Sequence, residues 1–305
     1  MLVFTHPACL GHDPGPDHPE SPERLQVMLD ALREAFPEQL AWRQAQPAKL
    51  GELARVHERA LIDDILQAQT EPLRRLDLDT FTSPGSASAA LHAAGAGVAA
   101  VAAVMEGPDR HAFCAVRPPG HHATADTAMG FCLLNNIAVA AAFAIEAHGL
   151  ERVAIVDFDV HHGNGTQAIF QNDARVAYCS THQSGLFPHS GNMRERGVGN
   201  VRNVLLPPGC DSFRFRNVWA DELLPQLEAF GPQLLFISAG FDGHRNDPQA
   251  DLMLETEDFG WLTRELARLA QRHAGGRVVS MLEGGYDLQA LRECSVAHVR
   301  ALLEG

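Results

Sequence analysis

Five short apolar segments, each followed closely by polar residues, constrain the fold of this chain more than any other feature. They are rich in β-branched or aromatic residues, as expected for strands buried on both faces of a sheet. The segments are Ala112–Val116, Val153–Phe158, Val176–Cys179, Leu234–Ser238 and Val278–Leu282. Helical patterns alternate with them, which indicates an α/β fold with a mainly parallel central sheet flanked by helices.

Residues 1–305 contain no repeat, low-complexity tract or obvious linker, which predicts a single domain. Ser21 and Thr256 are expected to cap the first and the last of the predicted helices. Those helices lie at Ser21–Phe36, within Leu50–Gln67, near Ser86–Met105, at Leu133–His148 and at Thr256–His273. The segment Ser86–Met105 is long enough to span a bilayer, but it is mostly Ala and Gly. We therefore expect a buried helix and no membrane association.

Charge and cysteine usage exclude several classes of protein. The 24 Lys and Arg against 38 Asp and Glu give a formal net charge of −14, which argues against nucleic-acid binding and would suit cationic substrates. The six cysteines form no Cys-x-x-Cys pair, so we expect neither a cysteine zinc site nor a disulfide framework. The N-terminal segment lacks the pattern of a signal peptide, which predicts a cytoplasmic protein. A homo-oligomer is left open.

The polar residues after the five strands are expected to meet. Ligands of parallel α/β sheets bind just beyond the carboxyl ends of the strands. The segments that follow the strands supply His, Asp, Asn and Tyr to one rim: Arg117–His122, Asp159–Asn164, Ser180–His182, Ala239–His244 and Glu283–Tyr286. The main structural prediction is therefore a functional site at this rim of the sheet.

The segment DFDVHHGNG, Asp157–Gly165, indicates a metal site. Alternate residues of an extended chain share a face, so Asp159 and His161 point the same way and form a suitable pair of zinc ligands. Asp242 could complete a set of two carboxylates and one imidazole, and His244 ranks below it. A hydrogen-bonded Asp/His network without metal is the alternative. Asp247, which precedes a proline, is expected to order a turn.

Two further motifs supply groups for proton transfer and for charge stabilisation. RPPGHHA places His121 and His122 side by side, as a general base and its partner or as a structural pair bonded to backbone. Asp157 and Asn164 are the candidates to orient them. LEGGYDL places Tyr286 after two glycines, where its hydroxyl could donate to an oxyanion; a surface tyrosine in a turn is the alternative.

Together these motifs resemble the histone deacetylase superfamily of zinc-dependent amidohydrolases, which share a fold with arginases. The resemblance covers nearly the whole chain, from HPESPER through RPPGHHA, GFCLLNN, DFDVHHGNG and SAGFD to EGGY. It implies a three-layer αβα arrangement, the arginase/deacetylase fold. It also implies hydrolysis of an acyl-lysine in a protein or peptide, or of an acetylated polyamine.

The resemblance also implies a role for individual residues. One Zn²⁺ would be held by Asp159, His161 and Asp242. His121 and His122 would flank the attacking water, with His122 as base and then acid; Asp157 would orient His121 and Asn164 would orient His122. Tyr286 would polarise the acyl carbonyl. Phe131 and Phe187 would form the two aromatic walls of the acyl tunnel, with Gly130 at its base; ordinary core packing is the alternative for the two phenylalanines. Asp79 is a candidate for binding the substrate backbone or amine.

Potassium is implied by the same resemblance. K⁺ near the zinc would match Asp157, Asp159, His161, Ser180 and Thr181. An outer K⁺ would match Phe170, Asp173 and Val176.

One departure from the family pattern concerns Asn164, which stands where many members have Asp. An asparagine can still bond His122 but brings no negative charge, so His122 should be protonated less easily. The form with Asn and EGGY is similar to the class II and bacterial branches. No reacting residue is missing, so we expect an active enzyme.

Two readings compete with a mononuclear deacetylase. An arginase-like hydrolase with two manganese ions would need more Asp ligands. A non-catalytic acyl-lysine binding module would bind ligand without releasing acetate, and the complete set of reacting groups argues against it.

Overall fold

The computed structural model describes residues 1–68 and 72–305, and its central feature is a parallel sheet. Within these residues eight strands pair in the order β2-β1-β5-β10-β9-β6-β7-β8, and every pair is parallel. The strands are β1 (Leu2–Thr5), β2 (Ala41–Gln44), β5 (His111–Cys114), β6 (Val153–Asp157), β7 (Val176–Gln183), β8 (Val201–Leu206), β9 (Leu234–Ala239) and β10 (Val278–Leu282). β3 (Arg74–Arg75) and β4 (Phe81–Thr82) form a separate antiparallel pair.

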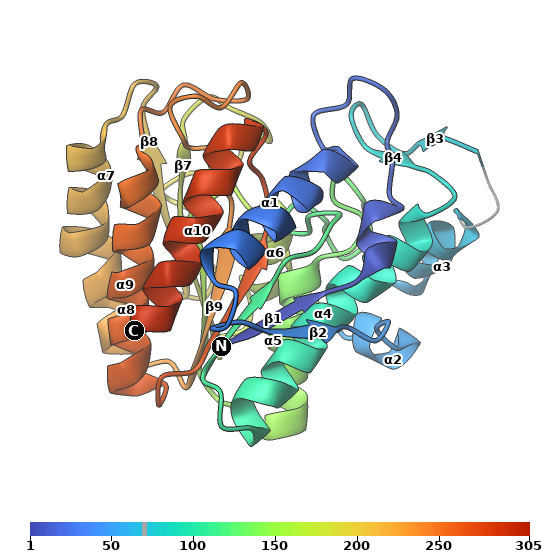
Figure 1. Ribbon diagram of the computed structural model, residues 1–305. Helices are drawn as coiled ribbons and strands as arrows, with labels where there is room; N and C mark the ends of the chain where they lie inside the picture. The colour runs from blue at the N-terminus through green and yellow to red at the C-terminus, as the bar shows by residue number, and fades with distance from the viewer. Residues whose placement is uncertain (69–71) are drawn as a thin grey trace.

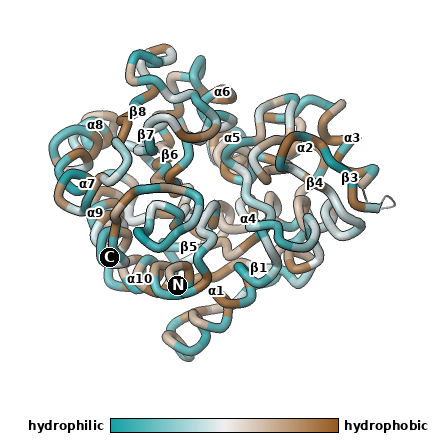
Figure 2. Tube along the Cα trace, turned by 90° about the horizontal axis from the view of Figure 1, so that it is seen from above, coloured by the Kyte–Doolittle hydropathy of each residue, from teal (hydrophilic) through white to brown (hydrophobic). Residues whose placement is uncertain are grey.

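Helices cover both faces of the sheet (Figure 1). On one face α10 (Leu288–Glu304) packs on α1 (Pro22–Ala35) and on α9 (Thr256–His273), and on the other α4 (Ser86–Glu106) packs on α5 (Asn136–His148). Seen from above in Figure 2, β5 and β6 lie between these two groups. The predicted three-layer αβα fold is thus confirmed. The shorter helices are α2 (Leu50–Leu53), α3 (Arg59–Gln67), α6 (Asn164–Phe170), α7 (Ser212–Val218) and α8 (Leu224–Phe230); single helical turns lie at Pro7–Leu10 and Trp219–Leu223.

All five predicted strands are present, with small changes at their ends. β5 spans His111–Cys114 and not Ala112–Val116, and β6 ends at Asp157, one residue early. β7 runs four residues beyond Cys179 to Gln183, because β8 pairs with that polar extension as far as Leu206. Burial explains the success of the prediction, since β6, β9 and β10 are buried at every position.

Four predicted helices differ in their details. The segment Leu50–Gln67 holds two short helices, α2 and α3, and not one. The helix predicted from Leu133 begins at Asn136, because the Asn135 side chain accepts a hydrogen bond from the Ala138 amide and caps it there. The cap of α9 is Glu255 and not Thr256, since Glu255 and Asp258 form a reciprocal capping box. Ser21 is the N-cap residue of α1, but its side chain forms no capping hydrogen bond.

The apolar helix α4 packs against α5 and the sheet, as expected for a buried helix. It is long and apolar enough to cross a membrane by length and composition alone, but most of its alanines and both of its glycines are buried in the fold. Small side chains let α4 approach its neighbours closely. At Gly97 an added Cβ would come within 2.8 Å of the Ala140 side chain.

The register of the central strands positions the site. Asp157, the last residue of β6, pairs with Ser180 of β7 on one side and with Ser238 of β9 on the other. Because all the strands run in the same direction, the segments that follow β5, β6, β9 and β10 leave the same edge of the sheet. This edge carries the predicted catalytic residues.

Candidate active site

A buried group of two carboxylates and one imidazole lies at the ends of β6 and β9. The ligand atoms of Asp159, His161 and Asp242 lie within 4.8 Å of one another. His161 Nδ1 is 3.2 Å from Asp159 Oδ1 and 3.1 Å from Asp242 Oδ2. The structure thus brings together the three residues that the sequence predicted as zinc ligands.

The electrostatics of this group fit a bound cation. Both carboxylates are fully buried, and within residues 1–68 and 72–305 neither forms an ion pair with a lysine or arginine. Burial, together with the charge of Asp159, raises the pKa of Asp242 to about 7. Two carboxylates and one imidazole with space for a further ligand form the donor set of a catalytic zinc site. The residues present therefore suit Zn²⁺.

His121 and His122 lie beside this group, each fixed by a different partner. His121 Nδ1 is 3.0 Å from Asp157 Oδ2, and His122 Nδ1 is 2.8 Å from Asn164 Oδ1. Burial would lower the pKa of His121, but Asp159 and Asp157 outweigh it and raise that pKa well above its usual value. Burial and the neighbouring histidines hold the pKa of His122 well below its usual value. The pKa values of the two adjacent imidazoles are therefore shifted in opposite directions.

Tyr286 completes the set of polar groups, and the backbone around it is held from two sides. Its amide donates to Asp247 Oδ2 at 2.6 Å. The other carboxylate oxygen of Asp247 accepts from the Gln249 amide at 3.0 Å, so Asp247 also orders its own turn, as predicted. The guanidinium of Arg24 lies 4.7 Å from the centre of the Tyr286 ring and donates to the backbone oxygens of Glu283 and Gly285, each at 2.6 Å. Burial raises the pKa of the Tyr286 phenol well above its usual value, so the hydroxyl keeps its proton.

A narrow pocket of about 60 Å³ opens onto these groups. Its lining joins the predicted substrate-binding residues to the catalytic ones: Asp79, His122, Gly130, Phe131, His161, Phe187, Gln249 and Tyr286. The Phe187 ring lies 5.0 Å from the His122 ring, and the Phe131 ring lies 5.7 Å from that of Tyr286, each edge-on. Gln249 is the one lining residue that the sequence did not single out.

The comparisons with known proteins agree with this geometry. Residues 18–302 match the histone deacetylase domain. The chain belongs to the histone deacetylase family. It is 39% identical over 301 residues to the histone deacetylase-like amidohydrolase of Pseudomonas aeruginosa, covering 97% of this chain and 78% of that protein. It is 38% identical over 303 residues to the human polyamine deacetylase HDAC10, covering 93% of this chain and 44% of that protein.

Among solved structures, the HDA15 HD domain superposes with a TM-score of 0.94 at 34% identity, covering 99% of this chain and 88% of that one. Membership of the histone deacetylase family makes the protein a hydrolase of amide bonds, and zinc dependence is general in the family. The reading as a binding module without catalysis is thereby set aside. In the part of the chain that the structure describes, Asp159, His161 and Asp242 are the single group of three or more His, Cys, Asp or Glu side chains placed to hold a metal, so no second group of this kind supports a site with two manganese ions.

Glu283 is a residue of this deacetylase site that the sequence reasoning missed. Its carboxylate accepts hydrogen bonds from the Gly120 amide at 2.7 Å, the His121 amide at 3.2 Å and the Ser238 hydroxyl at 2.9 Å. Burial raises its pKa to about 7. Glu283 thus ties the segment that carries the two histidines to the strand end that leads to Tyr286. Its place in EGGY was the available signal.

The oxygens predicted for the inner potassium lie beside the zinc ligands. Asp157 and Ser180 are register partners on β6 and β7, and the adjacent Thr181 hydroxyl is buried without a hydrogen-bond partner. A buried hydroxyl that lacks a partner can serve as an oxygen ligand of a hard monovalent cation. Phe170, Asp173 and Val176 are the residues matched to an outer potassium, and their backbone oxygens converge on the side-chain nitrogen of Asn200.

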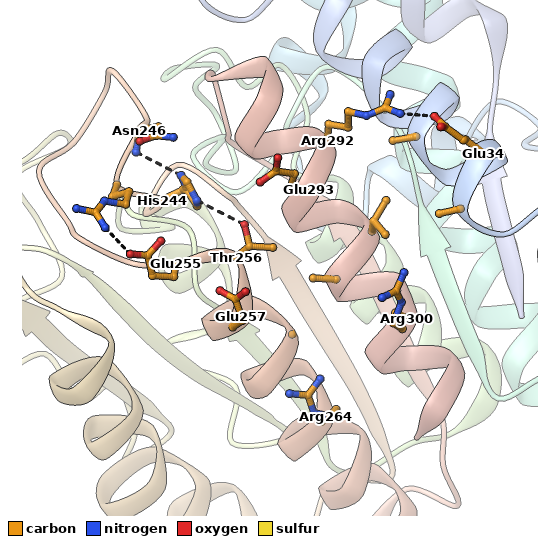
Figure 3. A pocket seen from close by; sticks show the side chains of 16 residues that line it. Glu34, His244, Asn246, Glu255, Thr256, Glu257, Arg264, Arg292, Glu293 and Arg300 are labelled. Carbon is orange, nitrogen blue, oxygen red and sulfur yellow. Dashed lines mark hydrogen bonds and ion pairs between the residues drawn. The ribbon is translucent and has the colours of Figure 1, made fainter.

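A larger cavity lies elsewhere, between α1, α9 and α10 (Figure 3). It measures about 860 Å³, and the one candidate site residue in its lining is His244. His244, the second choice as a metal ligand, lines it; its Nδ1 accepts from the Asn246 amide and its Nε2 faces the Thr256 hydroxyl, and it is not among the side chains grouped around the metal position. His244 therefore does not belong to the metal group.

Proposed function

We propose that this deacetylase-family enzyme removes acetyl or other acyl groups from the ε-amine of lysine in proteins or peptides. The observation that carries the proposal is the narrow pocket between Phe131 and Phe187. A slot of about 60 Å³ with two phenyl walls suits an aliphatic chain that ends in a small acyl group. Its lining offers one carboxylate, Asp79, and one neutral amide, Gln249, beside the catalytic groups. We further propose that residues 1–305 form one deacetylase domain.

In this proposal Asp159, His161 and Asp242 hold one Zn²⁺. When bound, the ion supplies a Lewis acid that polarises the amide carbonyl and makes water a stronger nucleophile at neutral pH. Every other step is assigned to the side chains of the chain itself.

His122 acts as the general base. Its Nδ1–H donates to Asn164 Oδ1, which leaves Nε2 unprotonated. Because its pKa is depressed, His122 is neutral at pH 7 and can take a proton from the attacking water. It then returns that proton to the leaving amine. One water is consumed, the amide C–N bond breaks, and a carboxylic acid and a free amine are released.

Tyr286 stabilises the oxyanion that forms on the acyl carbon. Tyr286, whose hydroxyl keeps its proton, lines the pocket with His122 and His161 and can donate to the carbonyl oxygen of an acyl group bound there. His121 and Asp157 form a charged, hydrogen-bonded pair behind the reacting groups. We assign this pair a positioning role. We also assign one K⁺ to the inner oxygens of Asp157, Asp159, His161, Ser180 and Thr181.

A second candidate function is the hydrolysis of small acetylated polyamines. It is favoured by the 38% identity to the human polyamine deacetylase and by the net charge of −14, which attracts polycations. Both substrate classes present an aliphatic chain to the same pocket, so the phenyl walls suit either.

Turnover of a substrate panel by the zinc-loaded protein tests the proposal. The panel contains acetyl-lysine and longer acyl-lysine peptides, acetylputrescine and acetylspermidine. We expect kcat/KM for an acyl-lysine peptide to exceed that for both polyamines. A higher value for acetylspermidine would replace the first function by the second, and no acetate release from any of them would overturn both.

A further inference from the structure

Three backbone carbonyls converge on one side-chain nitrogen near the end of α6. Asn200 Nδ2 lies 2.8 Å from the oxygen of Phe170, 3.0 Å from that of Asp173 and 2.7 Å from that of Val176. A primary amide has only two N–H hydrogens, yet three oxygens face this nitrogen. The carbonyls thus form a small negative cradle with the amide nitrogen at its centre.

Asn200 is held in this cradle by its other polar groups. Its side-chain oxygen accepts a hydrogen bond from the Val198 amide at 3.2 Å, and its backbone oxygen accepts one from the Tyr178 amide at 2.9 Å. The residue is only 9% exposed. The amide is therefore part of the packed fold and not a surface side chain that rests by chance on the loop.

A ring of backbone carbonyls around one point is how proteins replace the hydration shell of a potassium ion. The resemblance to deacetylases assigns an outer potassium to the residues Phe170, Asp173 and Val176. Here the point where their carbonyls converge is taken by the Asn200 nitrogen, with its partial positive charge and two donors. An ion and this nitrogen cannot share the position, so these residues do not fit an outer potassium.

We propose that the Asn200 amide permanently fills the place of a structural monovalent cation in this chain. The amide ties together the end of α6, the turn after it and the start of β7. The first residue of α6 is Asn164, which orients His122, so the clamp holds the far end of a helix that contributes to the site. The fold in this region is then independent of potassium, and replacing Asn200 by a small residue opens a cation site.

Two measurements test the proposal. The first is anomalous scattering from crystals of the wild-type protein soaked in thallium(I), a potassium substitute. We expect no thallium peak among the carbonyls of Phe170, Asp173 and Val176, whatever is found elsewhere. In crystals of Asn200→Ala we expect a peak at that point. A wild-type peak there would overturn the proposal, and this result does not depend on whether the variant folds.

The second measurement compares thermal unfolding in potassium chloride and in tetramethylammonium chloride. We expect Asn200→Ala to be stabilised by potassium several degrees more than the wild type is. Asn246→Ala is the matched control, because Asn246 is exposed and lines the separate cavity between α1, α9 and α10; it should respond as the wild type does. A folded Asn200→Ala protein with neither a thallium peak nor added potassium dependence would show that the carbonyls do not form a cation site.

Discussion

At the scale of single residues, the Tyr286 hydroxyl is the group whose removal tests the reaction most directly. Tyr286→Phe keeps the ring against Phe131 and removes one oxyanion donor. Loss of a single such donor lowers kcat by roughly 10²–10³. We expect a loss of that order with the zinc content unchanged, measured by steady-state turnover and metal analysis of the same sample. Near-normal turnover would remove Tyr286 from its role.

Gly130 offers a second prediction because its φ of +57° and its surroundings both exclude a side chain. A Cβ there would lie 2.5 Å from His122 Cδ2 and 2.8 Å from Phe187 Cε1. We expect Gly130→Ala to lower kcat/KM by roughly tenfold or more, since a displaced catalytic group commonly costs up to about 10²-fold.

The matched control for that substitution is Gly149→Ala. Gly149 also has a left-handed φ, +62°, but an added Cβ would meet nothing within 4 Å. Both variants carry the backbone strain of alanine in this region, roughly 1–3 kcal/mol. Only the first should lose activity in the folded state. Equal losses of activity in the two variants would mean that strain, and not the contact with His122, is responsible.

Which site residues the sequence could predict depended on where their partners lie. Asp159 and His161 stand two apart after a buried strand, so spacing alone placed them on one face. The role of Arg24 was not predictable in this way, because its hydrogen bonds join helix α1 to backbone oxygens 259 and 261 residues away. Glu283 was missed for the same reason, since its partners are backbone amides of another loop.

At the scale of elements, the sequence predicted five of the six interior strands, but it missed the interior strand β1 (Leu2–Thr5) and both edge strands. β6 and β9 are continuous apolar runs, whereas β2 (Ala41–Gln44) is half-buried to exposed and its sequence, AWRQ, carries no clear pattern. β8 was missed because Arg202 and Asn203 interrupt its apolar residues. The helix α10 was also missed, although the Asp287 side chain caps it through the Ala290 amide.

The packing of α9, α10 and β10 predicts a dependence of stability on pH. His298 of α10 bonds through Nδ1 to Thr263 of α9 at 2.7 Å and through Nε2 to Ser280 of β10 at 2.8 Å. Thr263 donates its own hydroxyl hydrogen to Phe259 O, so it must accept from His298, and Ser280 must then donate. The ring is fully buried and neutral, and burial lowers its pKa to about 3.

Because this pKa is depressed on folding, the unfolded chain binds the extra proton first. The contribution of His298 to the free energy of unfolding is constant above the pKa of about 6.5 that the ring has in the unfolded chain, and it turns unfavourable as the pH falls towards 3. At pH 5 it amounts to about 2 kcal/mol of lost stability. Urea unfolding of the wild type and His298→Gln at pH 7 and pH 5 measures it.

Between pH 7 and pH 5 we expect His298→Gln to lose about 2 kcal/mol less unfolding free energy than the wild type loses, whatever the stability of that variant at pH 7. His189→Gln is the control, because His189 is exposed and should leave the slope unchanged. An unchanged slope in His298→Gln as well would show that this ring does not stay neutral in the folded protein.

At the scale of the whole molecule, the charge of −14 sets a long-range field that single contacts do not describe. Such a field raises the local concentration of cations and speeds their association, and salt screens it. The Debye length falls from roughly 30 Å at ~0.01 M to roughly 10 Å at ~0.1 M ionic strength. The effect should therefore depend on the charge of the substrate and not on the acyl group.

Comparing acetylspermidine with an acetyl-lysine peptide that has neutral capped ends distinguishes the effect of the field from that of the reaction itself, because both substrates place an acyl amide in the same pocket. We expect kcat/KM for the polyamine to fall on the order of tenfold between those two ionic strengths, since steering by a charged surface raises association rates by roughly 10–10³. The neutral peptide should change little, which controls for salt effects on the fold and on the zinc ligands. If both substrates respond equally, the acidic surface does not steer substrate, and the net charge then ceases to favour a polyamine.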